Sequence, residues 1–141
     1  MSSTAGSQGP DSIRRRILIV EDDYLVALQF ENALTEAGYE VVDIASTADE
    51  AVQLVPDHHP ELVLMDVRLA GPRDGIQAAS EILDRFGVRS IFVSAFSDPT
   101  TRARADQAKP IAWLAKPVPV QKLVTAVNAA LREKPGGSEA R

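Results

Sequence analysis

Short apolar runs rich in β-branched residues alternate along this chain with longer segments of helical periodicity, and this alternation constrains the fold most. The first run, residues 17–20, contains no polar residue, as is typical of a parallel strand buried on both faces. Strand and helix alternate five times, which predicts a parallel sheet covered by helices on both sides. Right-handed crossovers make this a doubly wound α/β fold. The predicted strands are 17–20, 41–45, 62–65, 90–93 and 111–114.

Turn and cap residues divide the helical segments from the strands. Gly38 and Gly87 are typical of residues just after a helix. Thr47 predicts a helix N-cap with Glu50 in the capping-box position, and Pro56 is expected beyond the end of that helix. The Ala- and Arg-rich fourth helix is predicted to be weak. The helices are expected at about 25–34, 48–55, 75–86, 99–108 and 120–132.

Composition limits the classes of protein that the chain can be. Its 141 residues suit one domain, which we place at 13–133 between flexible tails at 1–12 and 134–141. The chain has no cysteine, and its two histidines, His58 and His59, are expected to be exposed. Thiolate and histidine-rich metal sites are therefore excluded.

Charge and hydropathy narrow the expected partners and location. The net charge is −5, and the only dense basic run is residues 14–16, so we expect no nucleic-acid partner. No apolar stretch approaches the roughly 18 residues that a membrane span needs. The polar N-terminus lacks the apolar region of a signal peptide. We therefore expect a cytoplasmic protein that does not bind membranes.

Chemically active side chains follow four of the five predicted strands. The carboxyl ends of parallel strands meet at one edge of a doubly wound sheet, which is where ligands bind. Acidic residues follow the first strand and end the third, a hydroxyl ends the fourth, and a lysine follows the fifth. These residues are Glu21, Asp22, Asp23, Asp66, Ser94 and Lys116.

This set indicates phosphoryl chemistry at a divalent cation. Clustered carboxylates repel one another unless a cation is present, and Mg²⁺ prefers oxygen ligands and often binds beside a phosphate. Lys116 and Ser94 can contact the same anion. The chain has neither of the glycine-rich nucleotide-binding motifs. We therefore expect a carboxylate to receive the phosphoryl group covalently.

Five motifs, in order and well spaced, resemble the receiver domain of two-component response regulators, over essentially all of residues 16–132. The resemblance implies a flavodoxin-like receiver fold with five helices and strand order 2-1-3-4-5. The motifs are ILIVEDD at 17–23, LVLMDVRL at 62–69, Asp74-Gly75, Ser94-Ala95 and LAKP at 114–117.

The resemblance implies a phosphorylation site and a Mg²⁺ site. Asp66 is expected to accept the phosphoryl group. Asp22 is expected to bind Mg²⁺ directly, and Glu21 through water. The backbone carbonyl of Arg68 completes the protein's share of the coordination, together with Asp66. Asp23 matches no ligand position, and we expect it to stabilise the start of the following helix.

The resemblance also implies a switch. Lys116 is expected to contact the phosphoryl oxygens, and Ser94 is expected to move toward them after phosphorylation. Trp113 matches an aromatic switch position, although an indole is larger than the usual Tyr or Phe, and it could instead be simple core. The Lys116–Pro117 bond is expected to be cis. Asp74-Gly75 is interpreted as turn and helix-start chemistry.

Three departures from the family pattern affect the loops around the expected site. The loop from Asp66 to Asp74 is one residue longer than in many receivers. Lys109 and Pro110 replace a Gly-containing turn, so the fourth helix is expected to end abruptly or to be mobile. Arg68 and Phe96 flank the expected path of attacking water, and we hypothesise that they set the lifetime of the phosphate.

The implied function is that of a stand-alone response regulator in bacterial-type signalling. A histidine kinase or histidine phosphotransfer protein would donate phosphate to Asp66, and the chain would catalyse only its own phosphorylation and dephosphorylation. Output would pass to a downstream protein, or through a homodimer formed by the fourth helix, fifth strand and fifth helix. The alternatives are a receiver fragment of a hybrid histidine kinase, a non-phosphorylated interaction module and a metal-dependent phosphatase. Arg68 argues against the phosphatase, which needs a carboxylate at that position.

Overall fold

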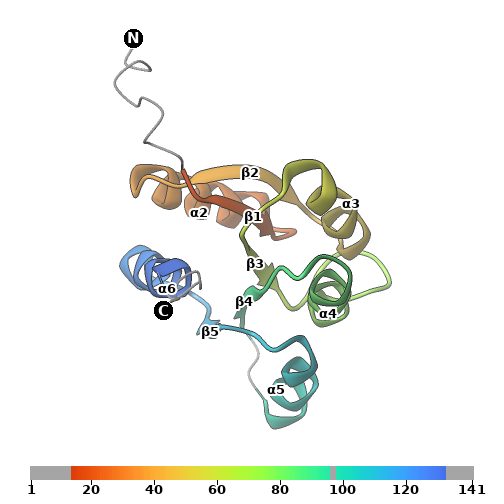
Figure 1. The fold of residues 1–141 in the computed structure, drawn as a ribbon. Helices are drawn as coiled ribbons and strands as arrows, with labels where there is room; N and C mark the ends of the chain where they lie inside the picture. The colour runs from red at the N-terminus through yellow and green to blue at the C-terminus, as the bar shows by residue number, and fades with distance from the viewer. Residues whose placement is uncertain (1–13, 96–97, 133–141) are drawn as a thin grey trace, which may run out of the picture.

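Five parallel strands in the order β2-β1-β3-β4-β5 form the sheet of this protein (Figure 1). The computed structural model describes residues 14–95 and 98–132. The fold class and strand order expected from the sequence are confirmed, with β3 in the middle of the sheet. The strands are β1 (Arg16–Val20), β2 (Glu40–Ala45), β3 (Leu62–Asp66), β4 (Ser90–Ser94) and β5 (Ala112–Ala115).

Helices cover both faces of this sheet, and each face has its own apolar core. Alternate residues of a strand point to opposite faces. Ile17 and Ile19 accordingly pack in the cluster of helices α2 and α6, whereas Leu18 and Val20 pack in that of α3, α4 and α5. The helices are α2 (Tyr24–Glu36), α3 (Ala48–His58), α4 (Gly75–Phe86), α5 (Pro99–Ala105) and α6 (Val120–Arg132), and a short 3₁₀ helix, η1 (Asp106–Ala108), follows α5.

Side-chain caps begin four of these helices, α2, α3, α4 and α5. Asp23 caps α2 by accepting from the backbone N–H groups of two residues in its first turn, as expected for an acid at that position. Thr47 caps α3 as predicted. Glu50 does not close a capping box, because its carboxylate instead accepts from the backbone N–H of Ser46. The complete capping box lies at α4, which Asp74 begins.

Helix α3 extends further than the sequence predicted. We expected Pro56 to lie beyond its end, but the helix continues through Pro56 to His58. A proline in the last turn removes only one backbone donor from the helix. The helix ends at His59, whose left-handed backbone (φ 51°) lets its N–H reach the carbonyl of Val55.

Helix α5 is shorter than its predicted range, 99–108. The α-helical part is 7 residues long, and 106–108 form η1. Lys109 then takes a left-handed backbone with φ 49°, so the helix does end abruptly, as the missing glycine indicated. The Arg89 guanidinium donates to the Lys109 carbonyl at 2.7 and 3.0 Å and holds this turn.

The remaining sequence-based predictions concern the two tails, Phe96, the two histidines and membrane-spanning helices. The two tails, 1–12 and 134–141, and Phe96 lie outside the described residues. His59 is exposed as expected, but the prediction for His58 was wrong, because it is half-buried with its ring 3.5 Å from the Asp43 carboxylate. Within residues 14–95 and 98–132, no helix is both long enough and apolar enough to cross a membrane.

Candidate functional site

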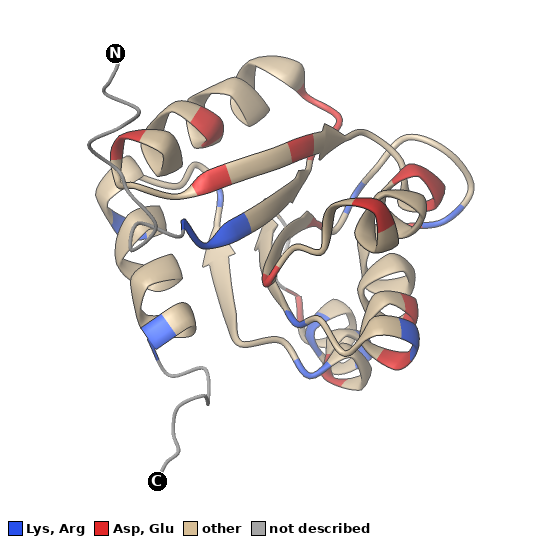
Figure 2. Ribbon diagram, turned by 45° about the horizontal axis from the view of Figure 1, so that its top comes forward, with Lys and Arg blue, Asp and Glu red and all other residues tan. Residues whose placement is uncertain are grey.

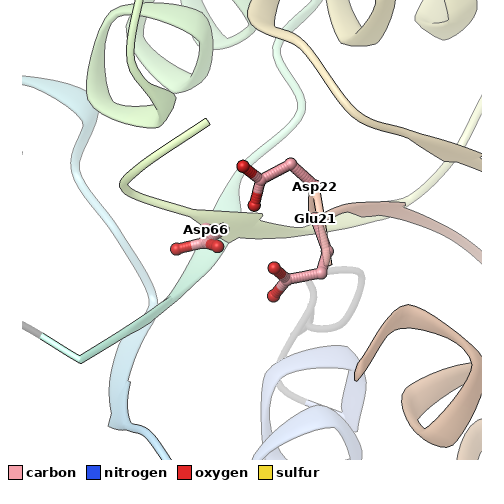
Figure 3. A group of neighbouring side chains, drawn as sticks. All are labelled: Glu21, Asp22 and Asp66. Atoms are coloured by element: carbon pink, nitrogen blue, oxygen red, sulfur yellow. The ribbon is translucent and has the colours of Figure 1, made fainter. Parts of the chain in front are cut away.

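Three carboxylates from two neighbouring strands gather at one edge of the sheet. Glu21 and Asp22 directly follow β1, and Asp66 ends β3, which pairs with β1 in parallel. One oxygen from each carboxylate lies within 4.8 Å of the other two (Figure 3). Glu21 and Asp66 are buried, with 3% and 6% of their surface exposed, whereas Asp22 is open to solvent. Two buried acids beside an exposed one form an acidic cluster whose oxygens lie close enough together to bind one metal ion.

Lys116 connects this cluster to the other half of the sheet. Its ammonium lies 2.7 Å from Glu21 Oε1 and 3.0 Å from Asp66 Oδ2. Its backbone N–H donates to the carbonyl of Ser94 at 2.9 Å, which fixes the lysine beside the end of β4. The following bond to Pro117 is cis, as expected. The lysine therefore lies between the acidic pocket and the β4–β5 side of the sheet.

Burial and neighbouring charges shift the pKa values of Glu21 and Lys116. Burial raises the pKa of Glu21 above the ordinary value of a glutamate; Lys116 opposes that shift, and Asp66 adds to it. Burial lowers the pKa of Lys116, but its contacts with Glu21 and Asp66 outweigh this effect and leave the pKa raised. The lysine is therefore held in its charged form, and the pocket holds more acid than one ammonium neutralises.

Asp66 is held by the backbone around it. The N–H of Arg68 donates to Asp66 Oδ1 at 3.3 Å, and the N–H of Gly75 donates to the Val67 carbonyl at 2.7 Å. A Cβ atom on Gly75 would lie only 1.8 Å from the carbonyl oxygen of Asp66. The start of α4 thus presses directly on the backbone of this aspartate, which only a glycine permits.

Ser94 and Trp113 lie on the neighbouring strands. Ser94 ends β4 and is 1% exposed. Trp113 pairs in register with Phe92, and the two rings are 5.4 Å apart between centroids. The Arg102 guanidinium lies over the half-buried indole at 4.5 Å from its centroid. Trp113, the side chain expected to switch, therefore contacts both α5 and a neighbouring strand of the sheet.

The structure brings the predicted acids and lysine together at one edge, with Ser94 and Arg68 adjoining them through the contacts above. Sequence reasoning interpreted Asp74 and Gly75 correctly as a helix start but missed the close approach of Gly75 to Asp66. The capping box itself was readable, because Asp74 and Gln77 have the required spacing. Nothing in the sequence pattern indicated the contacts of Arg102.

A doubly wound parallel sheet with clustered acids and a lysine at its carboxyl edge belongs to the class of α/β proteins whose ligand site lies at that edge. The family model described as "Response regulator receiver domain" matches residues 17–128, which span all five strands. The chain belongs to this family. Receiver domains typically bind Mg²⁺ at an acidic pocket and mostly serve as non-catalytic switches in two-component signalling.

Relatives and solved structures agree with that assignment. The chain is 39% identical over 120 residues to the transcriptional regulatory protein PdtaR of Mycobacterium tuberculosis, a match that covers 85% of this chain and 58% of that protein. It is 32% identical to the chemotaxis protein CheY of Bacillus subtilis, over 82% of this chain and 97% of CheY.

The fold is similar to that of the signal receiver domain of a modulated diguanylate cyclase from Desulfovibrio desulfuricans. The TM-score is 0.80 at 32% sequence identity, over 85% of this chain and 95% of that one.

Proposed function

We propose that this chain is a phosphoacceptor switch, in which Asp66 takes a phosphoryl group from a partner protein. The observation that carries the proposal is the convergence of Glu21, Asp22, Asp66 and Lys116 on one pocket at the sheet edge. Asp66 Oδ2 is the oxygen nearest to the lysine. A nucleophile beside both a cation site and a fixed ammonium is the arrangement that phosphoryl transfer requires.

The proposed transfer forms one bond and breaks another. A carboxylate oxygen of Asp66 attacks the phosphorus of a phosphohistidine, the P–N bond breaks, and the histidine ring leaves with the electron pair and takes up a proton from solvent. Lys116 stabilises the negative charge on the transferring phosphoryl oxygens. Hydrolysis of the aspartyl phosphate by water later returns free phosphate and the carboxylate.

The donor set fits a hard divalent cation. Asp22 is the exposed carboxylate, so we propose it as a direct Mg²⁺ ligand, with Asp66 and the Arg68 carbonyl; Glu21 lies deeper and acts through water. A bound Mg²⁺ would supply neutralisation of the phosphoryl oxygens in this site. Without such a cation, Glu21 and Asp66 share the ammonium of Lys116.

Labelling with acetyl phosphate tests this function. We expect one phosphoryl group per chain in the presence of Mg²⁺, none after chelation, and none in Asp66→Asn. Asp84→Asn is the matched control, because Asp84 is an exposed acid on α4 outside the pocket, and it should label like the wild type. Repeated turnover of varied phosphate esters would instead indicate a phosphatase, and no label at all an interaction module.

A protein donor fits the surface next to the pocket. Tyr24 and Leu25, at the start of α2, are 64% and 75% exposed, and Val120, at the start of α6, is 51% exposed. A mainly apolar hollow of about 360 Å³ lies between α2 and the segment that leads from β5 into α6, and its lining includes Phe30 and Lys116. Such a patch suits docking of a helical partner. We therefore propose it as the approach route of a histidine kinase or histidine phosphotransfer protein.

The docking route is tested by comparing a protein donor with the small-molecule donor acetyl phosphate. Leu25→Glu should slow labelling by a panel of autophosphorylated histidine kinases but leave labelling by acetyl phosphate unchanged. Equal labelling of the variant and the wild type by every kinase that phosphorylates the wild type would remove the patch from the proposal.

The output is proposed to pass through the β4–β5 side. Ser94 is to move toward the phosphoryl group, and Trp113 is to follow it, which changes the face formed by α5, β5 and α6. That face would contact a downstream protein or a second copy of this chain. Emission from Trp113, the single tryptophan of the chain, should change on labelling in the wild type and not in Asp66→Asn.

The lifetime of the phosphate is proposed to depend on Arg68 and Phe96. The Arg68 side chain is exposed two residues after Asp66. Dephosphorylation of labelled Arg68→Ala and Phe96→Ala is compared with the wild type, and unchanged rates in both would reject the idea.

We also propose that 13–133 is the unit that folds, with 1–12 and 134–141 as tails. Limited proteolysis that cuts within 13–133 first would contradict this division.

A further inference from the structure

Helix α5 and the loop between β3 and α4 face each other across a hollow. The hollow has a volume of about 340 Å³ and is lined on one side by residues 67–69 and 71–74 and on the other by Asp98, Thr101 and Arg104. Space of this size shows that α5 is not packed tightly against the loop that follows Asp66. In Figure 2, acidic and basic residues lie close together on the side of the molecule that carries α4 and α5.

One ion pair spans this hollow. Arg104, in the last turn of α5, donates to Asp74 Oδ2 at 2.9 Å. Both side chains are partly shielded from water, with 46% and 30% of their surface exposed. The pair therefore connects the helix expected to carry the output to the first residue of the α4 capping box.

Asp74 is in turn fixed relative to Asp66. Its other oxygen accepts from the N–H of Gln77, and the Gln77 side chain accepts from the N–H of Asp74, each within 3.0 Å. The adjacent Gly75 contacts the Asp66 backbone with no room for a side chain. Arg104 is thus linked to Asp66 through two consecutive residues, Asp74 and Gly75.

Because α5 buries few apolar side chains, the Arg104–Asp74 pair contributes a larger share of its stability than it would in a well-buried helix. Ala105 is the buried residue of α5, and Ala108 is that of η1. Two alanines bury little apolar surface, so polar contacts such as that of Arg104 contribute much of what holds α5 in place.

We propose that the Arg104–Asp74 pair is a positioning contact that holds α5 in its unphosphorylated place and so opposes phosphorylation of Asp66. The inference rests on the proposed function. Asp98, the N-cap of α5, follows Ser94 by four residues, so a movement of Ser94 toward the phosphoryl group pulls on the start of this helix and strains the pair. Because coupling between two sites is reciprocal, loss of the pair favours the phosphorylated state.

The test uses variants of the full chain that remove the pair in different ways. Arg104→Met removes the charge and keeps the length of the side chain, whereas Asp74→Asn keeps an N-cap acceptor. Arg104→Lys restores the charge. The matched control is Arg85→Met, because Arg85 pairs with Glu81 within α4, at 2.8 Å, and its replacement removes an arginine charge beside α5 without removing the Arg104–Asp74 pair. All four variants stay outside the acidic pocket.

Two readouts are measured. The first is the initial rate of Asp66 labelling by acetyl phosphate with Mg²⁺, which should rise about two- to fivefold in Arg104→Met and Asp74→Asn, the range that one exposed ion pair allows. The second is amide hydrogen exchange of residues 99–108 without any phosphodonor, which should accelerate by a similar factor. Arg104→Lys and Arg85→Met should match the wild type in both readouts. The double variant Arg104→Met/Asp74→Asn should be labelled no faster than either single variant.

The outcomes separate this inference from the proposed function. If Arg104→Met and Arg85→Met behave alike in both readouts, the positioning role is overturned while the phosphorylation of Asp66 stands. If the wild type is not labelled, the proposed function fails, and with it the effect on phosphorylation. The exchange measurement, made without donor, still decides whether the pair holds α5.

Discussion

Helices α4 and α5 lie on the same face of the sheet, yet they are held there by different forces. Helix α4 has a complete capping box, a left-handed glycine at its C-terminal end and buried residues along one side, among them Ile76 and Ile82. Helix α5 has an N-cap, one buried alanine and a 3₁₀ ending. Apolar burial holds the first helix, and charged contacts of arginine hold much of the second.

This difference matters because the two kinds of force respond differently to a change at the site. Burial of a large aliphatic side chain stabilises by about 1.5–3 kcal/mol, whereas an exposed ion pair contributes about 0–1 kcal/mol. A helix held by the weaker kind can be displaced by a modest new contact. The helix next to Asp66 is thus rigid, and the one beyond Ser94 is the more easily moved.

The largest expected effect comes from the rigid side, at Gly75. Gly75→Ala would place Cβ at 1.8 Å from the Asp66 carbonyl, so α4 or the end of β3 must shift, at a cost of about 3 kcal/mol or more in unfolding free energy. Labelling of Asp66 should fall with it. Urea unfolding measures the first effect.

Gly38→Ala is the control for this substitution. Gly38, unlike Gly75, has a positive φ, 99°, and nothing lies within 4 Å of an added Cβ. Only backbone strain of about 1–2 kcal/mol is expected there, with labelling unchanged. Equal losses at the two glycines would contradict the close approach of α4 to Asp66.

The next effect compares the cores beneath the two helices. Ile82→Ala in α4 removes a fully buried side chain and should cost about 2–4 kcal/mol. Ala105→Gly in α5 should cost only about 1 kcal/mol. Chemical denaturation of both variants checks this, and a larger loss at Ala105 than at Ile82 would reverse the contrast between the helices.

A smaller effect is expected at the cation–π contact between α5 and β5. Arg102→Gln removes the guanidinium over Trp113, which should cost about 0.5–1 kcal/mol and shift the emission of Trp113 to longer wavelength as the indole becomes more exposed. Arg85→Gln is its counterpart, since Arg85 lies 4.9 Å over the Phe86 ring on α4. That variant should leave the emission unchanged, and an equal shift would show that the contact of Arg102 is not the cause.

The smallest effect is the response to salt. Raising the ionic strength from about 0.1 to about 1 M shortens the screening length from about 10 to about 3 Å. Amide exchange of residues 99–105 should then accelerate, by less than about threefold, whereas exchange of 75–86 should stay constant. Exchange monitored by mass spectrometry checks this. Parallel acceleration of both segments would indicate general loosening instead of weakened ion pairs.

The same contrast explains what the sequence could predict. Strands such as 17–20 and helices with a clear apolar face, such as α4, follow from periodicity because burial imposes that pattern. The acids and Lys116 could be placed together because parallel strands bring their carboxyl ends to one edge.

The remainder depends on contacts that periodicity does not encode. Long arginine side chains make the ion pair of Arg104 and the contact of Arg102 with Trp113, and each joins α5 to another element of the fold. Helix α3 continues through Pro56 because a proline in the last turn removes only one backbone hydrogen-bond donor from the helix. Each of these depends on the three-dimensional arrangement of the elements, which the hydrophobic pattern does not specify.

The position of Asp66 at the end of the middle strand sets the length of the signalling route. Asp66 pairs in register with Val93, the neighbour of Ser94 in β4, and strands lie about 4.8 Å apart. A chemical change on this aspartate is therefore one strand away from the segment that leads into α5, and equally close to the acids that follow β1 on the other side. The proposed switch therefore needs no long-range relay, because the proposed phosphorylation site lies directly beside the strand that precedes α5.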